Sequence, residues 1–123
     1  MANKGTHSYQ PDNRNKNIKV YINGEFHPRE EANISVFDSG FLLGDGVWEG
    51  IRLFNNHIVF LKEHLDRLYS GANKLAIDIG KSKDELVDLI EKTLDANKMK
   101  TGVHIRLIVT RGLKSTPYQH PSA

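Results

Sequence analysis

The first half of the chain alternates apolar and polar residues, which is the pattern of half-buried β-strands. In IKVYING the alternation ends at Asn23-Gly24, a strong signal for a tight hairpin turn, so we expect paired strands at 18–22 and 25–27. VWEGIRLF and HIVFL flank Asn55-Asn56 in the same way, and asparagine tolerates the left-handed conformation that tight turns require. The pattern therefore predicts two antiparallel hairpins.

The period changes in the second half of the chain. From residue 61 onward apolar residues recur every three or four positions, as in an amphipathic helix, and they are Leu61, Leu65, Leu68, Ala72 and Leu75. A second helix is expected from Ser82, because this hydroxyl and Glu85 three residues later form a capping box. The buried face expected for it consists of Leu86, Leu89, Ile90 and Leu94. VHIRLIVTR, residues 103–111, alternates again and predicts a further strand.

Strands, two helices and one more strand predict an α+β fold in which two helices pack on a mainly antiparallel sheet. Residues 1–17 are polar without apolar periodicity, so we expect an arm or tail. The α+β domain is expected over residues 18–112. Residues 113–123 are rich in turn-forming residues and are expected to be a loop that leads to a second domain.

Composition narrows the possible classes of function. The chain has 123 residues and no cysteine, so one domain is expected and disulfide scaffolds and thiol nucleophiles are excluded. Its formal net charge is +2 and both signs are interspersed, so the sequence does not indicate a basic surface that would bind nucleic acid or an anionic membrane. No apolar run reaches the roughly 18 residues of a membrane span and the N-terminus has no signal-peptide pattern, so we expect a cytoplasmic protein. His57 and His64 lack the spacing of metal ligands.

The strand predicted at 47–54 has an unusual outward face. A period of two puts Trp48, Gly50, Arg52 and Phe54 on one side. A flat aromatic wall, a residue without a side chain and a fixed cation would suit a flat anionic ligand, with Gly50 allowing close approach to the backbone. The alternative is that Trp48 and Phe54 belong to the core while Arg52 points into solvent. Alternation alone does not choose between the two.

The strand predicted after residue 102 has a similar face. His104 and Arg106 share one side of it, and Arg106 could receive a carboxylate through a bidentate fork, although the pattern alone slightly favours a solvated face. EHLDR, residues 63–67, is expected to be a surface and capping cluster. The glycines near residue 46 do not form a phosphate loop, because Glu49 breaks the G-x-G-x-x-G pattern and a strand follows.

Four segments together resemble a known family. VYINGEF, DSGFLLGDGVWEGIRLF, FLKEHLDRLYSGANKLAI and HIRLIVTRG occur in the order and spacing of the N-terminal domain of class IV aminotransferases, the fold-type IV pyridoxal-phosphate enzymes. The family includes branched-chain and D-amino acid aminotransferases, (R)-selective amine transaminases and aminodeoxychorismate lyase. The resemblance runs from about Lys19 to Gly112.

The resemblance implies roles for individual residues. Arg52, in EGIR, corresponds to the arginine that binds the phosphate of the cofactor, pyridoxal 5′-phosphate. Trp48, Phe41 and Leu43 correspond to residues that line the substrate pocket. Arg106 corresponds to the arginine that helps receive the substrate carboxylate in branched-chain enzymes. The family also implies a homodimer whose active sites lie at the interface between subunits.

The resemblance also implies that this chain lacks part of the family's active site. The family's Schiff-base lysine belongs to a second domain, so this chain supplies no catalytic residue and is expected to be inactive alone. EGIR and HIR are closest to branched-chain enzymes, whereas VTRGLKSTPYQ leans toward the D-amino acid and (R)-amine branches. An alternative of another class is a truncated, non-catalytic chain that serves as a dimerisation or binding module.

Overall fold

The computed structural model describes residues 11–114, and the chain divides into two compact units, Met1–Asn33 and Ile34–Ala123. Each unit is described here by itself. The boundary between them lies within the single domain that the sequence predicted over residues 18–112. Residues 1–10 of the expected arm and residues 115–123 of the expected loop lie outside the described residues.

The first unit contains the first predicted hairpin. Strands β1 (Lys19–Ile22) and β2 (Glu25–Pro28) pair antiparallel, and the turn residues Asn23 and Gly24 both have positive φ, at 49° and 96°. This geometry confirms the Asn-Gly turn signal. Two short 3-10 helices that the sequence pattern did not reveal flank the hairpin, η1 (Asn13–Asn15) and η2 (Arg29–Glu31).

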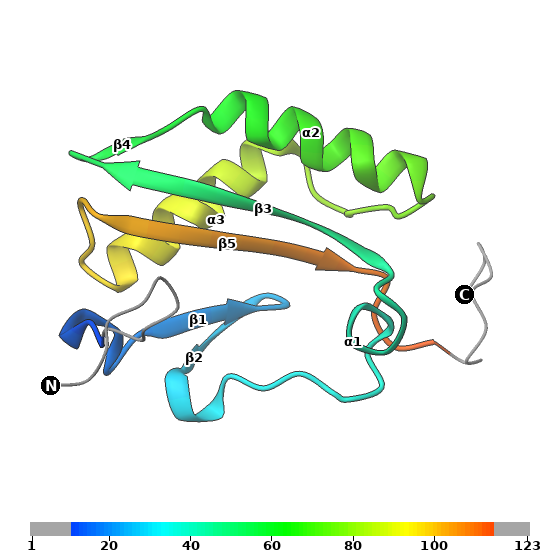
Figure 1. Cartoon of the computed structure of the whole chain (residues 1–123), viewed down its shortest axis with the longest axis horizontal. Coiled ribbons are helices and arrows are strands. Elements are labelled where there is room, and N and C mark those ends of the chain that lie inside the picture. The colour runs from blue at the N-terminus through cyan, green and yellow to red at the C-terminus, as the bar shows by residue number, and fades with distance from the viewer. Residues whose placement is uncertain (1–10, 115–123) are drawn as a thin grey trace, which may run out of the picture. The chain divides into compact units, whose positions relative to one another are not determined.

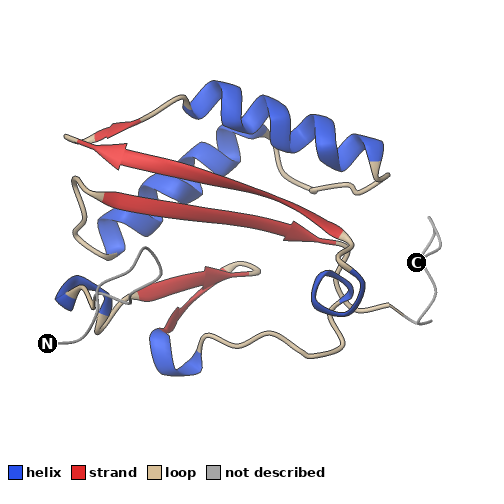
Figure 2. Cartoon of the chain, viewed as in Figure 1, coloured by secondary structure: helices blue, strands red, loops and turns tan. Residues whose placement is uncertain are grey.

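The second unit contains the second hairpin, the two long helices and the last strand (Figures 1 and 2). Its elements are α1 (Ser39–Leu43), β3 (Gly46–Phe54), β4 (His57–Ile58), α2 (Leu61–Lys74), α3 (Lys83–Ala96) and β5 (Val103–Thr110). The sheet has the order β4-β3-β5 and is antiparallel throughout. The predicted α+β class, with two helices on an antiparallel sheet, is therefore confirmed.

The core of this unit lies between the sheet and the helices. The buried residues of its main hydrophobic cluster come from β3, α2 and α3, and they are Ile51, Leu65, Leu68, Leu86 and Ile90. The capping box of α3 is present, because Ser82 Oγ accepts from the Glu85 amide while the Glu85 carboxylate accepts from the Ser82 amide. Leu75 departs from the prediction. It follows the last residue of α2 as the C-cap and is 42% exposed, because the chain leaves the helix there.

A short helix forms where the sequence showed only a turn. Asp38 caps α1 by accepting from the Gly40 amide, and Gly44 ends it in the left-handed conformation with φ of 67°. Thr110 Oγ1 donates to the other oxygen of Asp38, and the Ser39 amide donates to the Gly112 carbonyl. These bonds attach α1 to the end of β5, beside the start of β3 (Figure 1).

Candidate functional site

The two faces of β3 differ in environment as the period of two predicts. Ile51 and Leu53 face the helices and are 0% and 2% exposed, whereas Trp48 and Phe54 face outward and are 55% and 52% exposed. Of the two interpretations that the sequence left open, the one that buries Trp48 and Phe54 in the core is therefore wrong. We call the outward side of β3 and β5 the open face, and it comprises Trp48, Gly50, Arg52, Phe54, His104, Arg106 and Ile108.

Strand register brings the predicted site residues of β3 and β5 together. Arg106 lies opposite Gly50 in the ladder, and the next pair on the same face contains Trp48. The Arg106 guanidinium carbon stacks 3.7 Å from the centroid of the Trp48 ring. Arg52 lies farther along the same face, where its guanidinium carbon is 5.9 Å from the centroid of the Phe54 ring.

The space above Gly50 is filled rather than hollow. A Cβ atom at this position would lie 2.7 Å from Cε1 of His104 and 3.6 Å from Cζ3 of Trp48. The close approach to the backbone that the sequence led us to expect at this glycine is therefore made by His104 in the structure. Glycine at this position lets the imidazole of the neighbouring strand lie close to the β3 backbone.

The charges of the open face have one sign. None of its residues is acidic, and none of the ion pairs found among the described residues involves Arg52 or Arg106. Arg106 instead stacks on the ring of Trp48, and Arg52 lies near the ring of Phe54, so no carboxylate among the described residues occupies the N–H edges of either guanidinium. Two arginines with available donors on an acid-free face are suited to bind phosphate or carboxylate.

The opposite face of β3 contains a buried carboxylate that sequence reasoning missed. Glu49 is 5% exposed and accepts from Arg67 Nε and Nη2 at 2.9 and 2.7 Å, while His64 Nδ1 lies 2.7 Å away. The hydrogen bonds from Arg67 hold the pKa of Glu49 below its ordinary value, although burial acts in the other direction. The expectation of a surface and capping cluster in EHLDR is therefore wrong for His64, which is largely buried, whereas Arg67 is exposed as expected but its guanidinium reaches the buried carboxylate.

A signal for this network was present in the sequence. Glu49 occupies an inward position between Val47 and Ile51, and a carboxylate there needs a cationic partner. His64 and Arg67 are three residues apart on α2, which places them on one side of that helix.

A second buried carboxylate holds the junction between α1 and β3. Asp45 accepts from Arg111 Nε at 2.6 Å, and the ammonium of Lys114 lies 2.9 Å from the same oxygen. The hydrogen bond from Arg111 is the main cause that lowers the pKa of Asp45, and Lys114 adds to it. Arg111 also donates to the carbonyls of Leu75 and Ala76 at the end of α2. This junction fixes the orientation of α1 relative to the sheet.

Phe41 and Leu43, the other predicted pocket residues, lie on α1. Their side chains are 68% and 43% exposed. Gly40 lies against the side chain of Thr110, so α1 is held at the end of the sheet where Trp48 lies. The structure therefore places α1, which carries these two residues, at the end of the sheet farther from Arg52.

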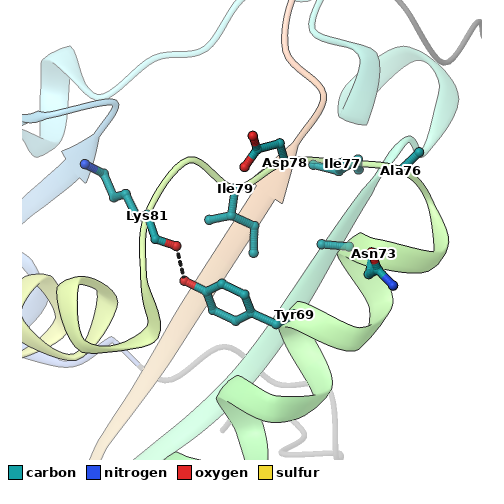
Figure 3. Close-up of a pocket in the computed structure, with 8 residues that line it drawn as sticks. Tyr69, Asn73, Ala76, Ile77, Asp78, Ile79 and Lys81 are labelled. Atoms are coloured by element: carbon teal, nitrogen blue, oxygen red, sulfur yellow. Dashed lines mark hydrogen bonds between the residues drawn. The ribbon is translucent and has the colours of Figure 1, made fainter.

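A pocket of about 370 Å³ lies elsewhere, in the helix layer at the end of α2 (Figure 3). Tyr69 spans part of it and donates from its hydroxyl to the carbonyl of Lys81 at 2.6 Å. Asn73 and Ile79 are among the other residues around it. None of the predicted site residues lines it, and α2 packs on the face of β3 opposite Trp48. We therefore place the candidate site on the open face.

Two further observations concern the described residues alone. No group of three or more histidine, aspartate or glutamate side chains within residues 11–114 could hold a metal ion. No helix in that range is long and apolar enough to cross a membrane.

Comparison with known proteins identifies the family. The model of the class IV aminotransferase family matches residues 46–123, which include β3, α2, α3 and β5. The chain belongs to the class IV aminotransferases. Among its relatives is a Methanocaldococcus jannaschii protein provisionally named as a branched-chain-amino-acid aminotransferase, which is 48% identical over 96 residues that make up 78% of this chain and 33% of the relative. A D-alanine aminotransferase of Staphylococcus aureus is 36% identical over 85% of this chain and 36% of its own length.

A solved structure agrees with this assignment. The branched-chain aminotransferase from the thermophilic archaeon Thermoproteus uzoniensis, crystallised with norvaline, matches with a TM-score of 0.71 and 29% identity. The match covers 83% of this chain and 35% of that protein. The chain thus spans about a third of the length of these class IV aminotransferases.

Proposed function

We propose that this chain is the N-terminal part of a pyridoxal-phosphate-dependent aminotransferase that moves an amino group between an amino acid and a 2-oxo acid. The observation that carries the proposal is the open face, where Arg52 and Arg106 lie without an acidic partner among the described residues. The family assignment supports the reaction class. The relatives with branched-chain names support a branched-chain amino acid as the amino donor.

The residues of the open face fit the anionic cofactor. Arg52 is exposed and has available donors, so it would bind the phosphate of pyridoxal 5′-phosphate through charge-assisted hydrogen bonds. When bound, the cofactor supplies the carbonyl that accepts the amino group and the conjugated ring that withdraws electrons from the substrate's α-carbon.

The remaining site residues would bind and orient the substrate. Arg106 would receive the carboxylate, which fixes the direction in which the amino acid lies. Trp48 provides a flat apolar surface beside it. Phe41 and Leu43 on α1 would contribute apolar surface to the binding of an aliphatic side chain.

The reaction class needs a lysine amine that links to the cofactor and moves the α-proton, and the open face does not supply one. Its only titratable side chains are two arginines and His104, and none of its residues is a lysine. We therefore assign proton transfer to a residue outside the open face, and we expect these 123 residues alone to have no aminotransferase activity.

A D-amino acid is the second candidate donor. The D-alanine aminotransferases of Staphylococcus aureus and Listeria monocytogenes are 36% and 41% identical to this chain over 85% and 84% of its length. Assays with both enantiomers of leucine and of alanine would separate the two candidates. Activity confined to the D-enantiomers would overturn the branched-chain assignment and leave the aminotransferase assignment intact.

The roles of the two arginines can be tested in a full-length enzyme that contains this segment. Arg52→Ala should weaken pyridoxal-phosphate binding roughly ten- to a hundredfold, since one charge-assisted phosphate contact contributes about 1.5–3 kcal/mol. Arg106→Ala should leave cofactor affinity nearly unchanged and raise the KM for the amino acid. Absorbance titration measures the first effect and steady-state kinetics the second. Equal loss of cofactor from both variants would contradict these assignments.

We also propose that the protein assembles as a homodimer. Several large apolar side chains near α1 are exposed, among them Ile34, Val36, Phe37, Phe41 and Leu113. Exposed apolar clusters of this kind are typical of interaction surfaces. Sedimentation of the chain at tens of micromolar should show self-association that Phe37→Ser weakens. A clean monomer would instead count against the proposal.

A further inference from the structure

The contact between Trp48 and Arg106 is the closest cation–aromatic contact among the described residues. The guanidinium carbon lies 3.7 Å from the ring centroid, compared with 5.9 Å for Arg52 on Phe54 and 5.6 Å for Lys83 on Tyr69. A separation of 3.7 Å is van der Waals contact over the face of the indole. The two side chains are therefore stacked rather than merely near each other.

Strand register explains why the stack forms. Trp48 pairs with Ile108 and Gly50 pairs with Arg106, so the arginine lies diagonally across the ladder from the indole. Such diagonal neighbours are within reach of aromatic and long side chains. Glycine at position 50 offers no side chain that could separate them, and the His104 imidazole and Trp48 Cζ3 both lie close above that glycine.

Stacking constrains the arginine without using its donors. The indole face occupies one flat side of the guanidinium, while the five N–H groups point outward in its plane. An arginine side chain that is free in solvent must lose much of its rotamer freedom before both arms of its fork can meet a carboxylate. A guanidinium already held flat loses less of that freedom when it binds.

We infer that Trp48 is a positioning residue, which holds the Arg106 guanidinium flat so that its N–H edge is ready to receive the substrate carboxylate. This inference rests on the proposed role of Arg106. It assigns to Trp48 a function that acts through the arginine, in addition to its apolar surface in the pocket. The relevant substrate class is amino acids and 2-oxo acids, because both carry a carboxylate.

The stack itself can be tested in the 123-residue chain without any activity. Protons above the face of an indole ring are shifted upfield, so the Arg106 side-chain resonances should lie upfield of those of Arg52. Trp48→Leu should remove that shift, and Trp48→Phe should retain part of it. Phe54→Leu is the matched control, since it removes an outward aromatic ring from the same strand without touching the stack. Arg106 resonances that are unchanged in Trp48→Leu would overturn the inference.

The functional consequence can be tested in the full-length enzyme. Trp48→Leu should raise the KM for the amino acid about two- to fivefold, the range expected for an exposed cation–π contact, with little change in kcat. The KM for the matching amine without a carboxylate should rise less than the KM for the amino acid, because the amine loses only the apolar surface of Trp48, and Trp48→Phe should restore most of the affinity for the amino acid. Equal KM increases for the amino acid and the amine would show that Trp48 acts only as pocket wall, which would overturn the inference.

A double-mutant cycle separates this inference from the proposed function. We define carboxylate discrimination as the ratio of the KM for the amine to the KM for the amino acid. In an Arg106→Ala background, Trp48→Leu should have no further effect on this ratio. If Arg106→Ala does not alter that discrimination, the proposed role of Arg106 fails. If Arg106→Ala alters it and Trp48→Leu does not, the positioning role alone fails.

Discussion

Within residues 11–114, arginine side chains lie on both sides of β3, but only those on the helix side have a carboxylate to bind. On the helix side, the carboxylate of Glu49 is buried and is bound by Arg67 and His64. On the open side, Arg52 and Arg106 have no acidic partner among the described residues. The comparison teaches that an arginine contributes to stability where it satisfies a buried carboxylate and is free to bind a ligand where no carboxylate lies near it.

Neighbouring positions on β3 should respond very differently to truncation. Ile51→Ala should reduce the free energy of unfolding by about 2–5 kcal/mol, because Ile51 is fully buried in the core. Arg52→Ala should reduce it by no more than about 1 kcal/mol, since the side chain is exposed and packs little. Urea denaturation of both variants measures the difference. Similar losses would show that the open face belongs to the core.

Neutralising the buried carboxylate should have the next largest effect. Glu49→Gln keeps the shape of the side chain but removes the charge that Arg67 and His64 meet, so we expect a loss of about 1.5–3 kcal/mol in unfolding free energy. Glu63→Gln, on an exposed position of α2, is the control and should be neutral. A stability loss that is no larger for Glu49→Gln than for the control would mean that the network is not formed.

Lowering the pH should reduce the stability that the buried carboxylates of Glu49 and Asp45 contribute. The pKa values of Glu49 and Asp45 are lowered in the folded protein, so their contribution to stability is complete above the ordinary carboxyl pKa of about 4. It is lost as the pH falls from there through the lowered values. The wild-type chain should therefore lose more unfolding free energy between about pH 6 and pH 3 than Glu49→Gln does. Parallel pH profiles for the two proteins would contradict this account.

The smallest effect concerns anions on the open face. Inorganic phosphate at a concentration equal to its dissociation constant should stabilise the chain by about 0.4 kcal/mol, relative to sodium chloride of equal ionic strength. Arg52→Ala should abolish this increment. Arg67→Ala should retain it despite a lower starting stability, because Arg67 lies on the other side of β3. If Arg67→Ala alone lost the stabilisation by phosphate, the anion would bind on the helix side of β3 and not on the open face.

Local signals predicted much of the fold. Two asparagine-containing turns, a capping box and two changes of period indicated the strands and both long helices, because each signal lies within a few residues of sequence. The five-residue helix α1 was missed, since it is too short to show a period. The residues of the open face followed from alternation, but the roles of Arg52 and Arg106 came only from resemblance to a family and stay predictions.

Long-range pairing explains what the sequence did not reveal. Glu49 meets partners 15 and 18 residues away on α2, and their contact depends on how the helix packs on the sheet. The space above Gly50 is filled by His104, which requires the register of β3 and β5 to be known. Alternation assigns a side chain to a face, but the neighbour that it meets there is set by tertiary structure.

The central claim is that the open face, and not the helix side, binds the anionic ligand. The most direct measurement is a titration of the labelled chain with pyridoxine 5′-phosphate, which has no aldehyde to react with lysines, while the Nε–Hε signals of its arginines are followed by NMR. We predict saturable shifts for Arg52 and none for the carboxylate-bound Arg67 and Arg111. Shifts confined to Arg67 or Arg111, or no shift of Arg52 at saturating ligand, would contradict the account.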